Sequence, residues 1–271
     1  MRLVRLDAPL GVRQARLSED DSTYLPLRDA RIPGCDAPSI ESPLSVLGAP
    51  PLLVPVQPSK IVCVGRNYRA HAAELGHDVP SRPLLFFKPT TALLAPGATI
   101  LLPPDSEAVE HEAELGVVIG RRVRHLHPDD ALAAVAGYCC VNDVTARDLQ
   151  RRDGQFARAK GFDTFCPVGP FLRAGLDPRD LAVRCFVGAE LRQDGRTSQL
   201  VFDVATLVAA ISRIMTLLPG DLIATGTPAG VGPLADGDVV TVTIDGLGAL
   251  INPVARDRGA LDLAPPISEA R

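Results

Sequence analysis

The segment that most constrains the fold is an apolar run over residues 113–119, which follows Glu112 and contains Glu114. This pattern is typical of a β-strand, and the absence of further charge up to residue 119 predicts that the strand lies in the core. Side chains two residues apart on a strand share a face, so both carboxylates should point the same way. Two buried like charges are costly unless a partner compensates them.

A third carboxylate, Asp143, follows another apolar stretch over residues 133–141 and is predicted to reach the same place. A divalent cation would compensate the three charges, and ligation by carboxylates alone favours Mg²⁺, Mn²⁺ or Ca²⁺ over zinc. The alternative is an edge strand with Glu112 and Glu114 on its solvent face and Asp143 capping a helix. A Glu-x-Glu pattern by itself does not decide between the two.

Strand-like runs outnumber helical ones along the chain, and the two kinds do not alternate. This order predicts a β-rich α+β fold rather than a Rossmann sheet, and 25 prolines and 23 glycines imply many turns. The expected strands lie at residues 3–6, 12–17, 60–65, 84–87, 113–119, 183–187 and 238–244, and the expected helices at 68–75, 128–135 and 204–216.

The chain divides into three parts by composition. Residues 1–55 are predicted to form a small β-rich appendage with a proline-rich linker, residues 56–254 the main domain, and residues 255–271 a loose polar tail. The N-terminus begins directly as a strand, without the apolar region of a signal peptide. No uncharged apolar stretch approaches the ~18 residues that a membrane span needs, so we expect no membrane partner.

Composition also excludes several classes of partner. A net charge of −4 with scattered basic residues argues against nucleic acid, and the lack of tryptophan argues against a platform for stacked bases. None of the six cysteines forms a C-x-x-C pair, so neither a zinc ribbon nor a redox motif is indicated. Free thiols suit a reducing compartment and predict a cytoplasmic protein.

Two further motifs carry candidate chemistry. His71 and Glu74 are three apart on a predicted helix and therefore share a face. A carboxylate beside an imidazole orients it as a general base, although an ordinary surface pair has the same spacing. Lys160 lies between apolar residues and Gly/Pro turns, which suggests a side chain aimed inward at an anion; a solvated loop lysine is the alternative.

The fourth segment, residues 220–233, is a glycine-rich turn that contains Thr227. Such a turn can present backbone N–H groups and the threonine hydroxyl to a carboxylate. It lacks the Gly-Lys-Ser/Thr ending of a P-loop, so nucleotide binding is not indicated.

These segments, in this order, resemble the fumarylacetoacetate hydrolase family over residues 58–254. The similarity is greatest to the branch of acylpyruvases, oxaloacetate decarboxylases and 2-hydroxyhepta-2,4-diene-1,7-dioate isomerases. It implies a mixed β-roll with flanking helices and a homodimer. Two departures stand out: the interval between Asp148 and Lys160 is short, which leaves the pocket wall there undefined, and residues 1–50 match only loosely.

The resemblance also implies the roles of the candidate site residues. They are Glu112, Glu114 and Asp143 as metal ligands, His71, Glu74 and Lys160 as catalytic residues, and Arg66, Tyr68, Arg147, Gln150 and Thr227 as substrate-binding residues.

The expected reaction is metal-dependent hydrolysis of a C–C bond in a small 2,4-dioxo acid, such as an acylpyruvate or fumarylpyruvate, through an enolate that the metal stabilises. Mg²⁺ or Mn²⁺ is the expected ion, with Ca²⁺ as a further candidate. Oxaloacetate decarboxylation and dienoate isomerisation use the same metal site and stay as alternatives. A non-catalytic protein that the metal merely stabilises is a remote alternative.

Overall fold

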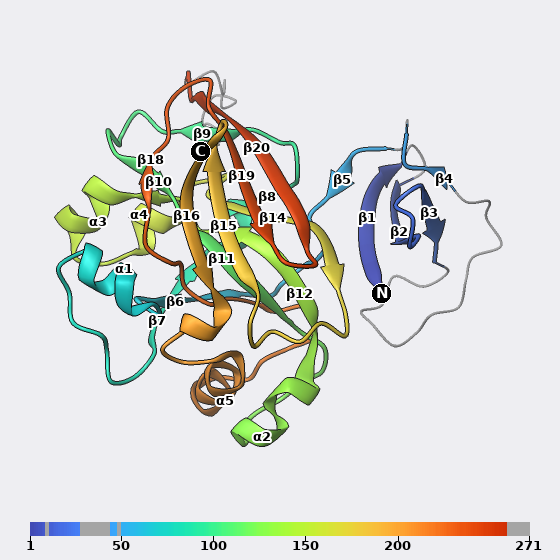
Figure 1. Ribbon diagram of the computed structural model, residues 1–271, viewed down its shortest axis with the longest axis horizontal. Helices are drawn as coiled ribbons and strands as arrows, with labels where there is room; N and C mark the ends of the chain where they lie inside the picture. Colours follow the sequence, from blue (N-terminus) through green and yellow to red (C-terminus); the bar gives the residue numbers. More distant parts are fainter. Residues whose placement is uncertain (9–10, 28–43, 48–49, 259–271) are drawn as a thin grey trace, which may run out of the picture.

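A twelve-stranded sheet forms the centre of the described chain, which comprises residues 1–8, 11–27, 44–47 and 50–258 of a computed structural model (Figure 1). Along the sheet the strands are β4 (Leu44–Ser45), β3 (Thr23–Pro26), β2 (Gly11–Leu17), β1 (Arg2–Ala8), β14 (Cys166–Arg173), β12 (Val135–Asn142), β11 (Ala113–Ile119), β17 (Leu222–Ala224), β6 (Ile61–Gly65) and β7 (Leu84–Lys88), with β5 (Leu52–Leu53) on β1 and β8 (Leu93–Leu94) on β14. Most neighbouring strands are antiparallel, but β17 pairs in parallel with β6, and β8 pairs in parallel with β14.

Two smaller sheets complete the β-structure of the described residues. The larger of them runs β16 (Glu190–Arg196), β15 (Ala182–Val187), β19 (Val239–Ile244), β20 (Gly248–Arg256) and β9 (Ile100–Leu102). The other is β13 (Thr145–Ala146), β10 (Val109–His111) and β18 (Gly232–Pro233). The predicted β-rich α+β class is confirmed.

The helices are short and lie outside the sheets. They are α1 (Arg69–Glu74), α2 (Pro128–Ala131), α3 (Arg147–Asp153), α4 (Ala157–Gly161) and α5 (Val204–Ile214), with 3-10 turns η1 (Thr90–Ala92), η2 (Leu132–Ala134) and η3 (Thr197–Gln199). In Figure 1, α1, α3 and α4 lie on the side of the molecule opposite the N-terminal strands β1–β4. None of the described helices has the length and apolar character needed to cross a bilayer.

Helix α5 illustrates how sequence dictates these ends. The Asp203 side chain accepts a 2.8 Å hydrogen bond from the Thr206 backbone N–H, which caps the first turn. Its apolar positions Leu207, Val208 and Ile211 are buried, as the helical spacing predicts. The predicted helix over 128–135 is in fact one α-turn followed by a 3-10 turn, because β12 begins at Val135.

Strand β11 is buried on both faces between β12 and β17. Leu115 and Val117 pack into the larger core cluster against the five-stranded sheet and α5, whereas Val118 packs into a second cluster on the opposite face. Glu112 and Glu114 have the even parity of Val118, so they project toward that second face. The edge-strand alternative is wrong, because the two glutamates are only 4% and 2% exposed.

The N-terminal strands have a small core of their own, made of Val4, Leu6, Ala15 and Tyr24 with Phe171 from β14. They join the central sheet through two register pairs between β1 and β14. The division into residues 1–55 and 56–254 stays a prediction. At the other end, β20 continues through Arg256, and most of the predicted loose tail, residues 259–271, lies outside the described residues.

Candidate active site

The three carboxylates meet where β10 ends and β11 begins. Glu112 occupies the break between these strands: its backbone N–H donates to the Asn142 side-chain oxygen (2.9 Å) and its carbonyl accepts from the Asp143 N–H (2.9 Å). These bonds set Asp143, just past β12, opposite Glu112. One oxygen from each of Glu112, Glu114 and Asp143 lies within 4.8 Å of the others, and all three residues are buried.

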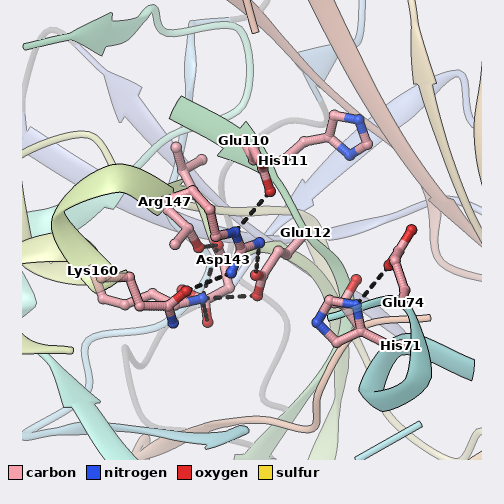
Figure 2. A network of polar contacts seen from close by, with 12 residues as sticks. His71, Glu74, Glu110, His111, Glu112, Asp143, Arg147 and Lys160 are labelled. Carbon is pink, nitrogen blue, oxygen red and sulfur yellow. Dashed lines mark hydrogen bonds and ion pairs between the residues drawn. The ribbon is translucent and has the colours of Figure 1, made fainter. Parts of the chain in front are cut away.

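Two buried cations, Lys160 and Arg147, contact this triad (Figure 2). Lys160 Nζ lies 2.8 Å from both Glu112 Oε2 and Asp143 Oδ2. Arg147 donates from Nη2 to Glu112 Oε1 (2.6 Å) and from Nε to Glu110 (2.7 Å). The predicted inward aim of Lys160 is therefore what the structure has: its side chain is 2% exposed, on α4 rather than on a loop.

The pKa values of the two glutamates move in opposite directions. Burial, with the charges of Asp143 and Glu112, raises the pKa of Glu114 well above its usual range. Burial also disfavours the charged form of Glu112, but the nearby Lys160 and Arg147 outweigh it and lower the pKa of Glu112. Glu114 is thus the carboxylate whose charge is least compensated by the protein.

This donor set fits a hard divalent cation. Three converging carboxylate oxygens are ligands that Mg²⁺, Mn²⁺ and Ca²⁺ prefer. A cation would also stabilise the charged form of Glu114, which the protein compensates least. A cation bound here would compete with Lys160 for Glu112 Oε2 and Asp143 Oδ2.

A cavity of about 720 Å³ opens onto the triad. Its wall includes Glu112 and Glu114, while Asp143 lies behind Lys160, which is part of the wall. Of the other predicted site residues, Arg66, His71, Arg147, Gln150 and Thr227 also line the cavity.

The His71–Glu74 pair lies on the other side of Glu112 from Lys160 (Figure 2). His71 Nδ1 is 2.9 Å from Glu74 Oε2, and His71 is 4% exposed. The second oxygen of Glu74 accepts the Gly230 N–H (2.9 Å), so the pair is tied to the glycine-rich turn. With Glu74 accepting from Nδ1–H, Nε2 carries the basic lone pair.

The glycine-rich turn donates to the protein's own carboxylates. The Gly226 N–H bonds Glu114 Oε2 at 2.7 Å, just as the Gly230 N–H bonds Glu74. The Thr227 hydroxyl donates to the Ala113 carbonyl (2.9 Å), which leaves its oxygen as an acceptor. The turn was expected to offer these groups to a substrate carboxylate, yet two of its N–H groups and the hydroxyl proton are already engaged.

Two more predicted residues have distinct placements. Gln150 accepts from Arg147 Nη1 (2.7 Å), so it positions the guanidinium while lining the cavity. Tyr68 is 2% exposed and its hydroxyl lacks a hydrogen-bond partner within the described residues. Burial, and then the charge of Glu114, raise the Tyr68 pKa.

Sequence reasoning missed two residues that hold the site together. Lys88, at the end of β7, lies 2.6 Å from Asp143 Oδ1 with its side chain fully buried. Gln193, on β16, donates to the Thr227 hydroxyl (2.7 Å) and accepts from the Ala113 N–H (3.0 Å). Lys88 could have been predicted, because a lysine at an inward position of an apolar strand needs a buried anionic partner. No local sequence pattern indicates the role of Gln193.

The chain belongs to the fumarylacetoacetate hydrolase family. The model described as "Fumarylacetoacetate (FAA) hydrolase C-terminal" matches residues 60–255, and the family fold is confirmed by solved structures of similar sequence. The enzymes of this family include hydrolases, isomerases and an oxaloacetate tautomerase.

Three relatives illustrate that range. A 2-hydroxyhepta-2,4-diene-1,7-dioate isomerase from Mycobacterium marinum is 42% identical, covers 95% of this chain and 99% of its own, and superposes with a TM-score of 0.85. The mitochondrial oxaloacetate tautomerase Fahd2a of Rattus norvegicus is 42% identical over 74% of this chain and 68% of its own. The fumarylpyruvate hydrolase of Pseudomonas aeruginosa, solved with Mn²⁺ and pyruvate, is 34% identical over 84% and 95% of the two chains, with a TM-score of 0.71.

Proposed function

We propose that this protein is a divalent-metal-dependent hydrolase that cleaves a C–C bond in a small 2,4-dioxo acid, such as an acylpyruvate or fumarylpyruvate. The observation that carries the proposal is that His71, paired with Glu74, lines the same cavity as Glu112 and Glu114 of the carboxylate triad. A hydrolase needs a base for water, whereas decarboxylation needs none. The relative solved with Mn²⁺ and pyruvate supports both the ion class and the product class.

Each residue has a role in this scheme. Glu112, Glu114 and Asp143 would hold Mg²⁺ or Mn²⁺, which supplies Lewis-acid stabilisation for the negative charge of an enolate. His71 Nε2 takes a proton from water as the water oxygen bonds to the distal carbonyl carbon. The C–C bond then breaks, its electron pair stays on the pyruvate fragment as an enolate, and the other fragment leaves as a carboxylic acid. Lys160 adds positive charge beside the enolate, and the proton that His71 took from water then passes to the enolate carbon, which gives pyruvate.

Substrate contacts are assigned by position on the cavity wall. Arg66 and Arg147 supply positive charge for a carboxylate, and Gln150 keeps the Arg147 guanidinium in place. Thr227 lines the cavity from the glycine-rich turn. Tyr68, at the start of α1, is not among the lining residues and is assigned a substrate role because it lies near enough to Glu114 for that charge to raise the Tyr68 pKa. We further propose that the protein is a homodimer, which light scattering of the purified protein would test, and that it is cytoplasmic.

The first test removes the base. We expect His71→Ala to lose acylpyruvate cleavage by about 10²–10⁴-fold, the usual contribution of a general base, while any oxaloacetate decarboxylation continues. His127→Ala is the matched control, because His127 pairs with Asp129 on the exposed surface (3.3 Å). Equal loss of both activities in His71→Ala would refute a separate water-activating role.

The second test removes the metal. Treatment with EDTA should abolish turnover, because without the cation the site lacks the positive charge that stabilises an enolate. Added Mg²⁺ or Mn²⁺ should restore turnover. Turnover that survives complete chelation would sink the metal-dependent mechanism.

A second candidate function is interconversion of enol and keto forms of a 2-oxo acid. The relatives named isomerase and tautomerase, each 42% identical, favour it. This reaction needs only proton transfers beside the enolate. A panel of 2-oxo and 2,4-dioxo acids, assayed for both cleavage and enol absorbance, separates the two: His71→Ala should keep isomerisation but not cleavage.

A further inference from the structure

Each carboxylate of the triad has one oxygen held by a different donor. Arg147 Nη2 holds Glu112 Oε1 (2.6 Å), the Gly226 N–H holds Glu114 Oε2 (2.7 Å) and Lys88 Nζ holds Asp143 Oδ1 (2.6 Å). The opposite oxygens of Glu112 and Asp143 face Lys160, and that of Glu114 has no hydrogen-bond partner in the described part of the chain. Each carboxylate therefore has one fixed oxygen, bonded by its own donor, and one available oxygen, which is either without a partner or bonded by Lys160.

Lys88 is the least expected of the three donors. Its side chain is fully buried, and Nζ also donates to the Val144 carbonyl at 3.0 Å. It comes from β7, whose antiparallel register with β6 pairs Lys88 with Ile61. Two acceptors and the strand backbone thus fix the position of the Lys88 ammonium, and Lys88 is not among the residues that line the substrate cavity.

The two lysines on Asp143 have different surroundings. Lys160 is part of the cavity wall and bridges two carboxylates through their available oxygens. Lys88 contacts only Asp143 within the triad, through the other oxygen. Of the two lysines, only Lys160 lines the cavity, where an arriving cation could displace its contacts.

We propose that Lys88 is a positioning residue that limits Asp143 to one metal-binding oxygen, and that the site thereby discriminates against large cations. The inference rests on the divalent-metal dependence proposed above. Ca²⁺ takes six to eight oxygens and readily uses both oxygens of a carboxylate, whereas Mg²⁺ and Mn²⁺ accept fewer, singly bound ligands. A triad with one oxygen per carboxylate suits the smaller ions.

The test is the ratio of dissociation constants for Ca²⁺ and Mn²⁺, measured by titration calorimetry on the full chain. Both ions carry the same charge, so the ratio cancels the purely electrostatic effect of removing an ammonium. In Lys88→Met, Asp143 regains its second oxygen, and the ratio should fall by about tenfold, the lower end of effects seen for partners of metal ligands.

Lys60→Met is the matched control. Lys60 also pairs with a buried aspartate, Asp221, which is bonded to Ser59 and to the Leu218 N–H but to no member of the triad. It should destabilise the protein by a similar mechanism and leave the ratio unchanged. A ratio unchanged in folded Lys88→Met, or lowered equally in Lys60→Met, would overturn the proposal.

A measurement on the wild-type protein keeps the idea testable if Lys88→Met does not fold. Infrared difference spectra of Mn²⁺-loaded minus metal-free protein, with ¹³C-labelled aspartate carboxyls, should show the wide splitting of a singly bound carboxylate. The narrow splitting of a doubly bound one would overturn the proposal. If the wild type binds neither ion, the metal-dependent function fails; if it binds Mn²⁺ and only the ratio fails, Lys88 alone loses its role.

Discussion

At the scale of single residues, Asp143 lies between two lysines that carry the same charge but have different surroundings. Lys160 and Lys88 bond its two oxygens at 2.8 and 2.6 Å, yet only Lys160 faces the cavity. Their removal should therefore have different consequences for a bound cation.

Lys160→Met should bind Mn²⁺ more tightly than the wild type while losing turnover. The variant removes both a competitor for two carboxylate oxygens and a like charge. Unit charges 4 Å apart at an effective dielectric of 20 interact by about 4 kcal/mol, so we expect a gain of about tenfold or more after relaxation. Calorimetry and initial rates measure the two effects. Weaker Mn²⁺ binding in this variant would mean that Lys160 supports the ion instead of competing with it.

Residue-level prediction succeeded where one segment contained its own signal. The Glu-x-Glu pattern at the start of an apolar strand predicted that two carboxylates share a face, although it left open whether that face was buried or exposed to solvent. The partners of those carboxylates were harder to predict, because Lys88 lies 55 positions from Asp143 and Gln193 lies 34 from Thr227. Such contacts are set by strand order, which no local pattern encodes.

At the scale of elements, the turn from Thr225 to Gly230 links the triad to helix α1. Asn67 holds the turn by donating to the Thr225 carbonyl at 2.8 Å. Gly226 has a φ of +98°, and an added Cβ would lie 2.7 Å from the Asn67 Cβ and 3.2 Å from the Val64 carbonyl oxygen. Glycine is thus required here for both backbone conformation and space.

Gly226→Ala should cost about 2–5 kcal/mol of unfolding free energy, the sum of backbone strain and overpacking. It should also weaken Mn²⁺ binding, because the backbone shift that relieves the new Cβ contacts moves the N–H of residue 226 away from Glu114. Gly237→Ala is the control, with a φ of +90° but nothing within 4 Å of the new Cβ; it should cost about 1–2 kcal/mol and leave Mn²⁺ affinity alone. Urea denaturation and calorimetry give both numbers. Equal behaviour of the two variants would contradict the role of Gly226.

Element prediction was best where hydrophobic period and length agreed. The strand over 113–119 and the helix beginning at 204 have the predicted starts. The short two-residue strands β8 and β13 were not predicted, because two residues contain no period to detect. β13 nevertheless matters, since it carries the chain from Asp143 into α3 and Arg147.

At the scale of the whole molecule, the N-terminal strands extend the central sheet but contribute no residue to the site. The contact between β1 and β14 consists of two register pairs, and the separate small core borrows only Phe171. The cavity wall is drawn from residues 64–227. Within the described residues, strands β1–β5 therefore lie apart from the cavity.

Deletion of residues 1–55 should leave a folded protein with lower thermal stability and Mn²⁺ affinity within about twofold of the full chain. The loss of stability follows from exposing Phe171 and Leu172, each of which buries apolar surface worth about 1.5–3 kcal/mol. Circular dichroism melts and calorimetry provide the comparison. A truncated chain that binds Mn²⁺ tenfold more weakly would contradict the predicted domain boundary.

The parallel pairing of β6 with β17 has a consequence for synthesis of the protein. Lys60 and Asp221, at the start of this pairing, are 161 positions apart. Glu114 likewise accepts a hydrogen bond from the N–H of Gly226, which is synthesised 112 residues later. A nascent chain on the ribosome therefore cannot assemble the site until nearly all of β17 and the following turn have emerged. Prematurely terminated chains should carry the carboxylates but capture no ion, so errors in translation yield inert fragments instead of partly active ones.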